Sequence, residues 1–225
     1  MGHSTQGPMK ILVIDVGGTH VKLLASGRRT PLKLPSGPDL TPRDMVRAVR
    51  EATATWHYDA VTIGYPGPVK DNKPAADPIN LGKGWVRYDF KKAFKKPVKI
   101  MNDAAMQAIG SYDGGNMLFL GLGTGLGTAL VRDGAIIPLE IAHLPYCKGR
   151  SYEEYVGAAA LKKFGPKKWR HHVEEVVGLF RAALTADYVV LGGGNARLME
   201  VLPPHTRLGS NLNAFRGGYR IWKTR

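Results

Sequence analysis

The sequence predicts an α/β protein built from two similar halves. Short apolar runs with β-branched residues, such as KILVID (10–15) and DYVVLGGGN (187–195), alternate with stretches of helical periodicity. Each half also begins with a glycine-turned hairpin, DVGGT (15–19) in the first and LGTGLG (122–127) in the second. We therefore predict an N-terminal lobe over 9–103, a C-terminal lobe over 104–225, and a cleft between them near residue 103.

Cysteine content and hydropathy limit the protein class. The chain has 225 residues and one cysteine, Cys147, so it has no intrachain disulfide, and a reducing cytoplasm is the expected location. No run of about 18 apolar residues occurs, so we expect no membrane-spanning helix. Residues 1–8, MGHSTQGP, lack the apolar stretch of a secretory signal. We interpret them as an expression remnant, with the native sequence starting at Met9.

The net charge of +14 is partly clustered, in KKAFKK (91–96) and KKFGPKKWRHH (162–172). Such clusters indicate either solvated helix faces or a polyanionic partner. Nucleic acid, polyphosphate and acidic membranes all match this charge. A nucleic-acid surface would interleave aromatic residues with the basic ones, and only Phe164 and Trp169 do so, which disfavours that partner.

The first half reads as three strands, a helix, and then alternating strands and helices. Strands are expected at 10–15, 20–26 and 30–35, at 60–69 and at 97–103. Apolar residues at helical spacing predict a helix over 41–56, starting at Thr41 or Pro42. Residues 70–88 are rich in Pro, Asn and Gly and are expected to form a long functional loop. A helix is expected to begin just after Asp103.

The second half repeats the pattern. Residues 117–137 read as strand, glycine turn, strand, Asp-Gly turn and strand. Helices are expected at 151–164 and 166–184, followed by a buried strand at 187–195. The similar order in the two halves suggests duplication of one α/β unit.

Two glycine turns are candidates for binding phosphate. In DVGGT the glycines leave backbone N–H groups open to an anion, and Asp15 beside them suggests Mg²⁺ together with phosphate. In LGTGLG a strand follows, so the run is neither a dinucleotide fingerprint nor a P-loop. Two such hairpins facing a cleft suit phosphoryl transfer, which depends on positioning and charge neutralisation. A plain tight turn is the structural alternative for each.

Three further stretches carry polar or glycine-rich patterns. Asp103 ends a buried strand, where a general base would face an α/β crevice, although this stretch taken alone favours Asn102 or Asp103 as the cap of the next helix. Glu140 and His143 could bind the hydroxyls of a polyol or form a surface pair. The run LGGGN (191–195) could approach a phosphorylated ligand or make a strand-to-helix turn.

Together these stretches resemble the ROK family of sugar kinases, closest to its short polyphosphate-glucokinase-like branch. The resemblance covers nearly the whole chain in order. The matching segments are DVGGTHVKLL (15–24), GYPGPV (64–69), INLGKGW (79–85), MNDAAMQAIG (101–110), LGLGTGLGTALVRDG (120–134), LEIAH (139–143), YEEYVG (152–157) and VVLGGGNA (189–196).

The resemblance implies two ribonuclease-H-like (actin-like ATPase) lobes around a central cleft, and it implies a role for each motif. Asp103 would be the catalytic base for the sugar 6-hydroxyl. Asp15 would orient Mg²⁺ or its waters. Other sugar hydroxyls would be bound by Asn80, Asn102, Glu140, His143 and Glu153. The donor phosphates or nucleotide would contact Gly17, Gly18, Thr19, Gly123, Thr124, Gly125, Gly192, Gly193 and Gly194.

The chain also departs from the family pattern. Ala142 precedes His143 where the family usually has glycine, and only Cys147 remains of the zinc-binding segment, so we expect no structural zinc. No helix-turn-helix precedes residue 10, which argues against the repressor branch. The chain is short for the family, so parts of the second lobe must be trimmed.

The sequence therefore predicts a glucokinase-type hexose kinase that transfers phosphate from polyphosphate, ATP or both to the 6-hydroxyl of glucose. Two alternatives stay open. The first is an ATP-dependent kinase for another hexose, such as mannose or an amino sugar, and the second is a non-catalytic sugar-binding protein. The expected partners are a hexose and a phosphoryl donor, without a membrane or nucleic acid. The sequence does not set the oligomeric state, although a homodimer is common in the family.

Overall fold

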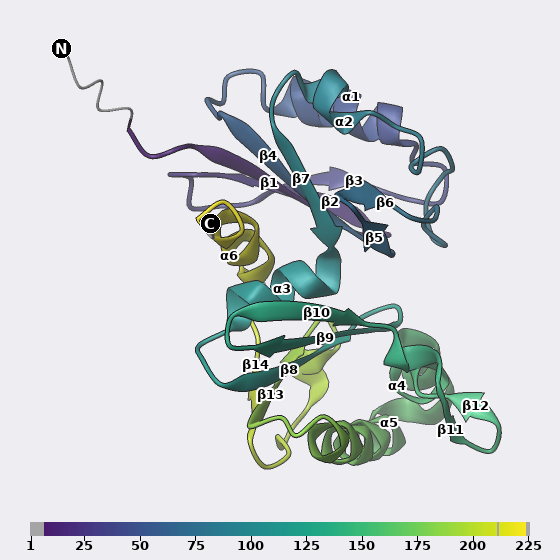
Figure 1. Cartoon of the computed structure of the whole chain (residues 1–225). Helices are drawn as coiled ribbons and strands as arrows, with labels where there is room; N and C mark the ends of the chain where they lie inside the picture. Colours follow the sequence, from purple (N-terminus) through teal and green to yellow (C-terminus); the bar gives the residue numbers. More distant parts are fainter. Residues whose placement is uncertain (1–6, 211, 224–225) are drawn as a thin grey trace. The chain divides into compact units, whose positions relative to one another are not determined.

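The computed structural model describes residues 7–210 and 212–223, which fall into two compact units (Figure 1). Most of the expected expression remnant, residues 1–6, lies outside the described residues. The first unit contains 7–103 and 218–223, and the second contains 104–217. The sequence analysis placed everything after 103 in one lobe, whereas the structure assigns 218–223 to the first unit. The reason is local packing, because Gly218 lies against Val13 and its carbonyl accepts a hydrogen bond from the Thr62 hydroxyl (2.8 Å).

The first unit is built on a five-stranded mixed sheet in the order β3-β2-β1-β4-β7. Strands β1, β4 and β7 run parallel, and β2 is antiparallel to both β1 and β3. Every residue of the two central strands β1 and β4 is buried, as expected for strands covered on both faces. The bounds are β1 (Ile11–Val16), β2 (His20–Ala25), β3 (Leu32–Pro35), β4 (Ala60–Tyr65) and β7 (Val98–Asn102).

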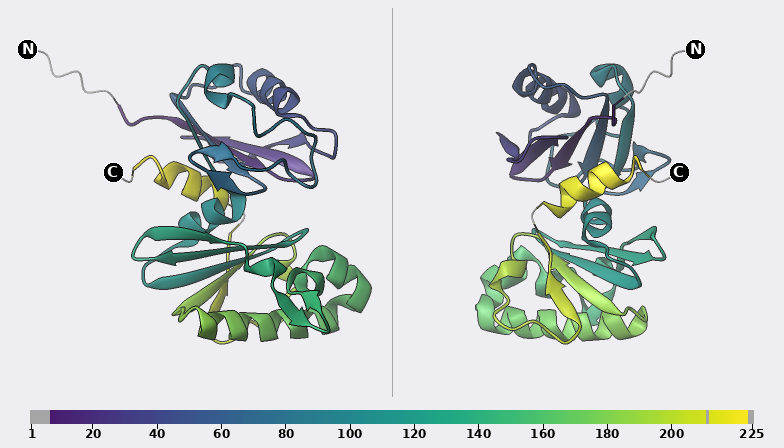
Figure 2. Two further views of the ribbon diagram at one scale, coloured as in Figure 1. Left: turned by 45° about the vertical axis from the view of Figure 1, so that its right-hand side comes forward. Right: turned by 90° about the vertical axis from the view of Figure 1, so that its left-hand side faces the viewer.

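Helices cover both faces of this sheet (Figure 2). On one face lie α1 (Pro42–Ala52) and α2 (Phe90–Phe94), whose apolar residues join the core formed with Leu12 and Ile14. The Thr41 side chain caps α1 by accepting a hydrogen bond from the Asp44 N–H (3.2 Å). The end of α6 (Asn213–Arg220) lies on the opposite face, where Gly218 meets Val13.

The segment 70–88 is more ordered than a plain loop. It begins with a short hairpin of β5 (Val69–Lys70) and β6 (Lys73–Pro74). At the hairpin tip, the Asn72 side chain donates to the Val98 carbonyl (3.0 Å) and accepts from the Ile100 N–H (2.6 Å). Asn72 thus satisfies backbone groups on the edge strand β7, which would otherwise be open to pairing with another chain.

The second unit repeats the sheet of the first. Its strands follow the order β10-β9-β8-β13-β14, again with two antiparallel pairings followed by two parallel ones. The duplication suggested by the sequence is therefore present in the topology. The bounds are β8 (Asn116–Leu122), β9 (Leu126–Arg132), β10 (Ala135–Leu139), β13 (Tyr188–Gly192) and β14 (Thr206–Leu208).

Two helices sandwich the second sheet, α5 (Ala158–Ala183) on one face and α3 (Asp103–Ser111) on the other. A short α4 (Glu153–Val156) precedes α5, and α5 is interrupted at Gly165 (φ 74°) just before Pro166. The expected helices at 151–164 and 166–184 therefore correspond to α4 and the two parts of α5. No helix of the described residues is long and apolar enough to cross a membrane.

Candidate active site

The first unit gathers three predicted site segments at one edge of its sheet. Strands β1, β4 and β7 are parallel, so their carboxyl ends meet at the same edge. Asp15 is near the end of β1 and Gly17–Thr19 follow that strand, while Asn102 ends β7 and Asp103 comes directly after it. This is the edge at which open α/β sheets bind ligands.

Asp15 has a cationic partner that the sequence analysis missed. Its carboxylate Oδ2 lies 3.2 Å from Lys22 Nζ, and its side chain is only 11% exposed. Lys22 stands directly across from Asp15 on the antiparallel strand β2. The turn between them closes with a hydrogen bond from the Gly17 N–H to the His20 carbonyl (3.0 Å). The signal was present in the sequence as a lysine seven residues after the aspartate, within the same hairpin.

The loop that carries Asn80 reaches this turn. A Cβ at Gly18 would lie 3.6 Å from the Asn80 Cβ, so the predicted sugar ligand and the predicted phosphate turn are neighbours. Asp77 organises the loop by accepting hydrogen bonds from the N–H groups of Trp85 (2.8 Å) and Gly84 (3.3 Å). These backbone bonds, that of Gly84 first, hold the pKa of Asp77 below its ordinary value.

Asp103 is the first residue of α3, where the helix dipole favours a carboxylate. It is half-buried, and the neighbouring Asn102 amide donates to the Gly67 carbonyl (3.2 Å) after β4. The next residue, Ala104, packs against Gly127 of β9 in the second unit's own core. Asp103 thus stands at the junction between β7 and α3, and its role as base stays a prediction.

In the second unit, the glycine turn between β8 and β9 is held from three sides. The Gly123 N–H donates to the Gly125 carbonyl (3.1 Å), and the Thr124 carbonyl accepts from Ala158 at the start of α5 (3.1 Å). Glu153, a predicted sugar ligand, lies against Gly125 and accepts a hydrogen bond from the Leu126 N–H (3.0 Å). Thr124 itself is exposed, so the turn presents an open tip.

The glycines after β13 lie beside this turn. Asn195 connects the two segments, because its amide donates to the Gly123 carbonyl (3.2 Å) and its N–H to the Leu122 carbonyl (3.0 Å). Gly192 packs on the Phe119 ring, and Gly193 (φ 81°) packs on the Leu122 backbone. Only Gly194 of the three glycines has open space where a Cβ would stand. Asn195 was not among the predicted site residues, although it ends the LGGGN motif.

Glu140 and His143 are brought together at a short 3₁₀ turn, η1 (Ile141–His143). Both side chains are exposed, with His143 Nε2 3.9 Å from Glu140 Oε2, and Ala142 between them is buried. Cys147 follows on β11 (Pro145–Cys147). Here Tyr146 donates to Glu175 on α5 (2.5 Å) and stacks on Tyr152 (4.8 Å between rings). In the described part of the chain, no group of three or more His, Cys, Asp or Glu residues is placed to hold a metal ion.

Comparison with known proteins agrees with the topology. The model of the ROK family matches residues 11–138. Polyphosphate glucokinases of Mycobacterium leprae and Mycobacterium tuberculosis are each 26% identical, over 82% and 85% of this chain. The matches span 63% of the M. leprae protein, less than two thirds of its length, and 80% of the M. tuberculosis protein.

The fold is shared with a solved kinase. The crystal structure of an inorganic polyphosphate/ATP-glucomannokinase from an Arthrobacter species superposes with a TM-score of 0.80 at 20% identity, covering 95% of this chain and 98% of the other. The predicted α/β fold with ribonuclease-H-like halves is therefore confirmed. The ROK family model matches more than half of this chain, and the chain therefore belongs to the ROK family.

Proposed function

We propose that the protein is a sugar phosphotransferase, a hexose kinase of glucokinase type that phosphorylates the 6-hydroxyl of glucose. One observation carries the proposal. The Gly17–Thr19 turn and Asp103 stand at the carboxyl edge of the same parallel strands, so a unit that offers phosphate-binding N–H groups also offers a carboxylate base. The relatives named polyphosphate glucokinase support the same activity.

Each group of predicted residues has a chemical task in the proposed reaction. Asp103 takes the proton from the sugar 6-hydroxyl as that oxygen forms its bond to the terminal phosphorus of the donor. The bond between that phosphorus and the bridging oxygen breaks, and the shortened donor leaves with the electron pair. Asn80, Asn102, Glu140 and His143 bind the sugar hydroxyls. The glycine turn at 123–125 binds the donor phosphates through backbone N–H groups.

Glu153 and Asn195 have positioning roles in this proposal. Glu153 holds the Leu126 N–H, and Asn195 holds the Gly123 carbonyl, so both fix the turn on which the donor rests. Glu153 therefore acts on the donor side through the turn, in addition to the sugar contact that the family resemblance implies.

The residues present fit a Mg²⁺ ion that is bound mainly by the phosphates of the donor. Mg²⁺ commonly binds through substrate phosphates, waters and one or two carboxylates, and it would neutralise charge on the transferring phosphoryl group. Asp15 lies on β1 just before the glycine turn of the first unit, and its partner Lys22 adds a positive charge there. Asp15 would thus orient waters of the ion.

The identities of the donor and of the sugar are the finer parts of the proposal. Polyphosphate and ATP are both named for the Arthrobacter kinase, and the basic composition of this chain suits a polyanionic donor. Glucose is the first sugar to test, with mannose and amino sugars as competitors. We place the protein in the cytoplasm on its single cysteine, and light scattering would test for a homodimer.

The test is sugar phosphate formation from glucose with ATP or polyphosphate at matched phosphate concentration. The Asp103→Asn variant should lose about 10²-fold or more in kcat with either donor, because the base is removed while the fold is kept. Asp133→Asn is the matched control, since Asp133 is exposed in a turn at φ 50°, which asparagine also adopts. The proposal fails if the wild-type protein makes no sugar phosphate from either donor.

A further inference from the structure

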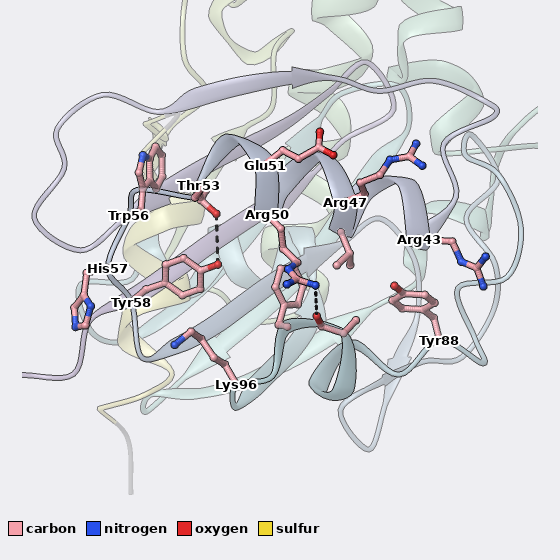
Figure 3. A pocket seen from close by; sticks show the side chains of 14 residues that line it. Arg43, Arg47, Arg50, Glu51, Thr53, Trp56, His57, Tyr58, Tyr88 and Lys96 are labelled. Carbon is pink, nitrogen blue, oxygen red and sulfur yellow. Dashed lines mark hydrogen bonds between the residues drawn. The ribbon is translucent and has the colours of Figure 1, made fainter.

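A basic groove lies between α1 and α2 in the first unit (Figure 3). Its volume is about 820 Å³. Arginines at 43, 47 and 50 of α1 line one side, and Lys96 after α2 lines the other. On β1 the side chains of Val13 and Asp15 point to the same face of the sheet, and Val13 meets α6 there. Leu12 and Ile14 point to the other face, where they pack with α1 and α2. The groove therefore lies on the face opposite to Asp15. The proposed catalytic residues do not line it.

The three arginines form one row along α1. Residues 43, 47 and 50 are spaced by four and three positions, so they share one helix face over about 10 Å. Arg47 pairs with Asp44 (2.8 Å), while among the described residues no carboxylate forms an ion pair with Arg43, Arg50 or Lys96. Glu51 is the acidic residue among those that line the groove. The row therefore keeps a net positive charge.

The charge continues beyond the groove. A second hollow of about 470 Å³ is lined by Lys91, Lys92 and Lys95 together with one carboxylate, Asp89, and it shares Lys96 with the first. The two hollows meet at Lys96, and we call their basic lining the α1–α2 track. It is composed of Arg43, Arg47, Arg50, Lys91, Lys92, Lys95 and Lys96. A long row of cations suits a linear polyanion better than a single compact anion.

The track begins at the site edge of the sheet. The start of α1 is tied to the loop of Asn80, because the Leu40 carbonyl accepts a hydrogen bond from the Gly82 N–H (3.1 Å). From there α1 runs back toward the amino end of β4, and α2 leads into the amino end of β7. A chain lying on the track would therefore have one end near the loop that carries a proposed sugar ligand.

The aromatic residues of the groove favour phosphate over nucleobases. The Arg28 guanidinium covers the Trp56 ring (4.1 Å to its centroid), and Lys96 Nζ covers Tyr58 (5.3 Å). Tyr88 meets the Phe90 ring edge to face (4.9 Å). Single-stranded nucleic acids need open aromatic faces for stacking, and cations occupy two of these faces instead.

We propose that the α1–α2 track is an accessory binding site for an inorganic polyphosphate chain, outside the active site. The inference rests on the proposed function, because that function makes polyphosphate a substrate. The track would hold the distal part of the chain and raise its affinity without taking part in chemistry. It should therefore affect long chains and leave ATP unaffected.

The first measurement is equilibrium binding of long-chain polyphosphate, which needs no turnover. The variant Arg43→Gln/Arg47→Gln/Arg50→Gln removes three charges and keeps good helix formers on α1. We expect about tenfold weaker binding and a plot of log K against log salt whose slope is smaller by about 3. The matched control, Lys162→Gln/Lys167→Gln/Arg197→Gln, removes three exposed charges from the second unit and should bind like wild type. Thermal melting checks that both variants are folded.

The second measurement is kinetic. The α1 variant should raise the KM for long-chain polyphosphate about tenfold, and leave kcat and KM for ATP and tripolyphosphate unchanged. Equal loss of binding in the control, or wild-type binding by the α1 variant, overturns the inference. The inference is also overturned if single-stranded DNA of equal charge competes for the track as strongly as polyphosphate does. If the wild-type protein yields no sugar phosphate from polyphosphate while the α1 variant alone loses binding, the proposed donor is wrong and the track stands.

Discussion

The carboxylate of Glu153 lies directly against Gly125, at the tip of the glycine turn between β8 and β9. From this position it accepts a hydrogen bond from the following backbone N–H, at Leu126 (3.0 Å). A side chain at position 125 would occupy the space of the carboxylate. The glycine is therefore required by a protein contact, whatever ligand the turn binds.

Substituting alanine for Gly125 should displace Glu153 and disturb the donor turn. We expect a loss of about 1–3 kcal/mol in the free energy of unfolding, as for other overpacked sites, together with a raised KM for the donor. Gly123→Ala is the control for stability, because a Cβ there meets nothing within 4 Å. Chemical denaturation and steady-state kinetics give both quantities. Equal stability of the two variants would contradict the assignment.

Glu153→Gln separates the two roles of this residue. Glutamine keeps an oxygen that can accept the Leu126 N–H, so the turn should survive and the donor KM should change little. Glu153→Ala leaves that N–H without its partner, at a cost of about 1–3 kcal/mol. If Glu153 serves only the sugar, both variants will raise the sugar KM and neither will change the donor KM.

The Asp15–Lys22 pair should stabilise the first hairpin, which carries the turn proposed to bind phosphate. Lys22→Met removes the ammonium and leaves a nearly buried carboxylate without its partner, so we expect a loss of about 1–3 kcal/mol. The double variant Asp15→Asn/Lys22→Met should recover part of that stability. A double-mutant cycle by chemical denaturation measures the coupling. Strictly additive effects would show that the pair is not coupled.

Two glycines allow α3 and α6 to cross at backbone distance. A Cβ at Gly217 would collide with the Met106 carbonyl, and one at Gly110 would collide with the backbone at Asn213. Gly217→Ala should lower the free energy of unfolding by about 1–3 kcal/mol. Gly178→Ala, at an exposed position in α5 with open space, should raise it by up to about 1 kcal/mol through helix propensity. Thermal melts that move in the same direction would contradict this assignment.

Stability should depend on pH through His172. Burial lowers the pKa of this imidazole below its ordinary value of 6.5, against the opposing attraction of Glu175. The unfolded chain then binds the proton more readily, so stability is lost as the pH falls below about 6.5 toward the folded pKa. His172→Phe keeps an aromatic ring beside Tyr146 and should flatten this dependence. Denaturation midpoints between about pH 7 and about pH 5 provide the measurement, and parallel profiles would exclude His172 as the source.

The central strands were predictable because their signals are local. The apolar runs at 10–15, 60–65 and 187–192 are strands that packing buries on both faces, so nearly every side chain is apolar. The turn at Asp133-Gly134 has positive φ at both residues (50° and 79°), as Asp-Gly predicts. The strand β14 and the helix α6 were missed. β14 has three residues, TRL, and α6 contains Gly217 and Gly218, which disfavour helix in isolation.

The motifs alone determined the family resemblance, the two glycine turns and the carboxylate at the end of β7, since each depends on residues close together in the chain. Tertiary structure decided the pairings between distant segments. Asn195 reaches Gly123 across 72 positions, and Thr62 reaches Gly218 across 156. It also decided that Glu153 holds the glycine turn between β8 and β9. Such contacts depend on which strands become neighbours and on where a missing Cβ leaves space, and neither is encoded in the spacing of a motif.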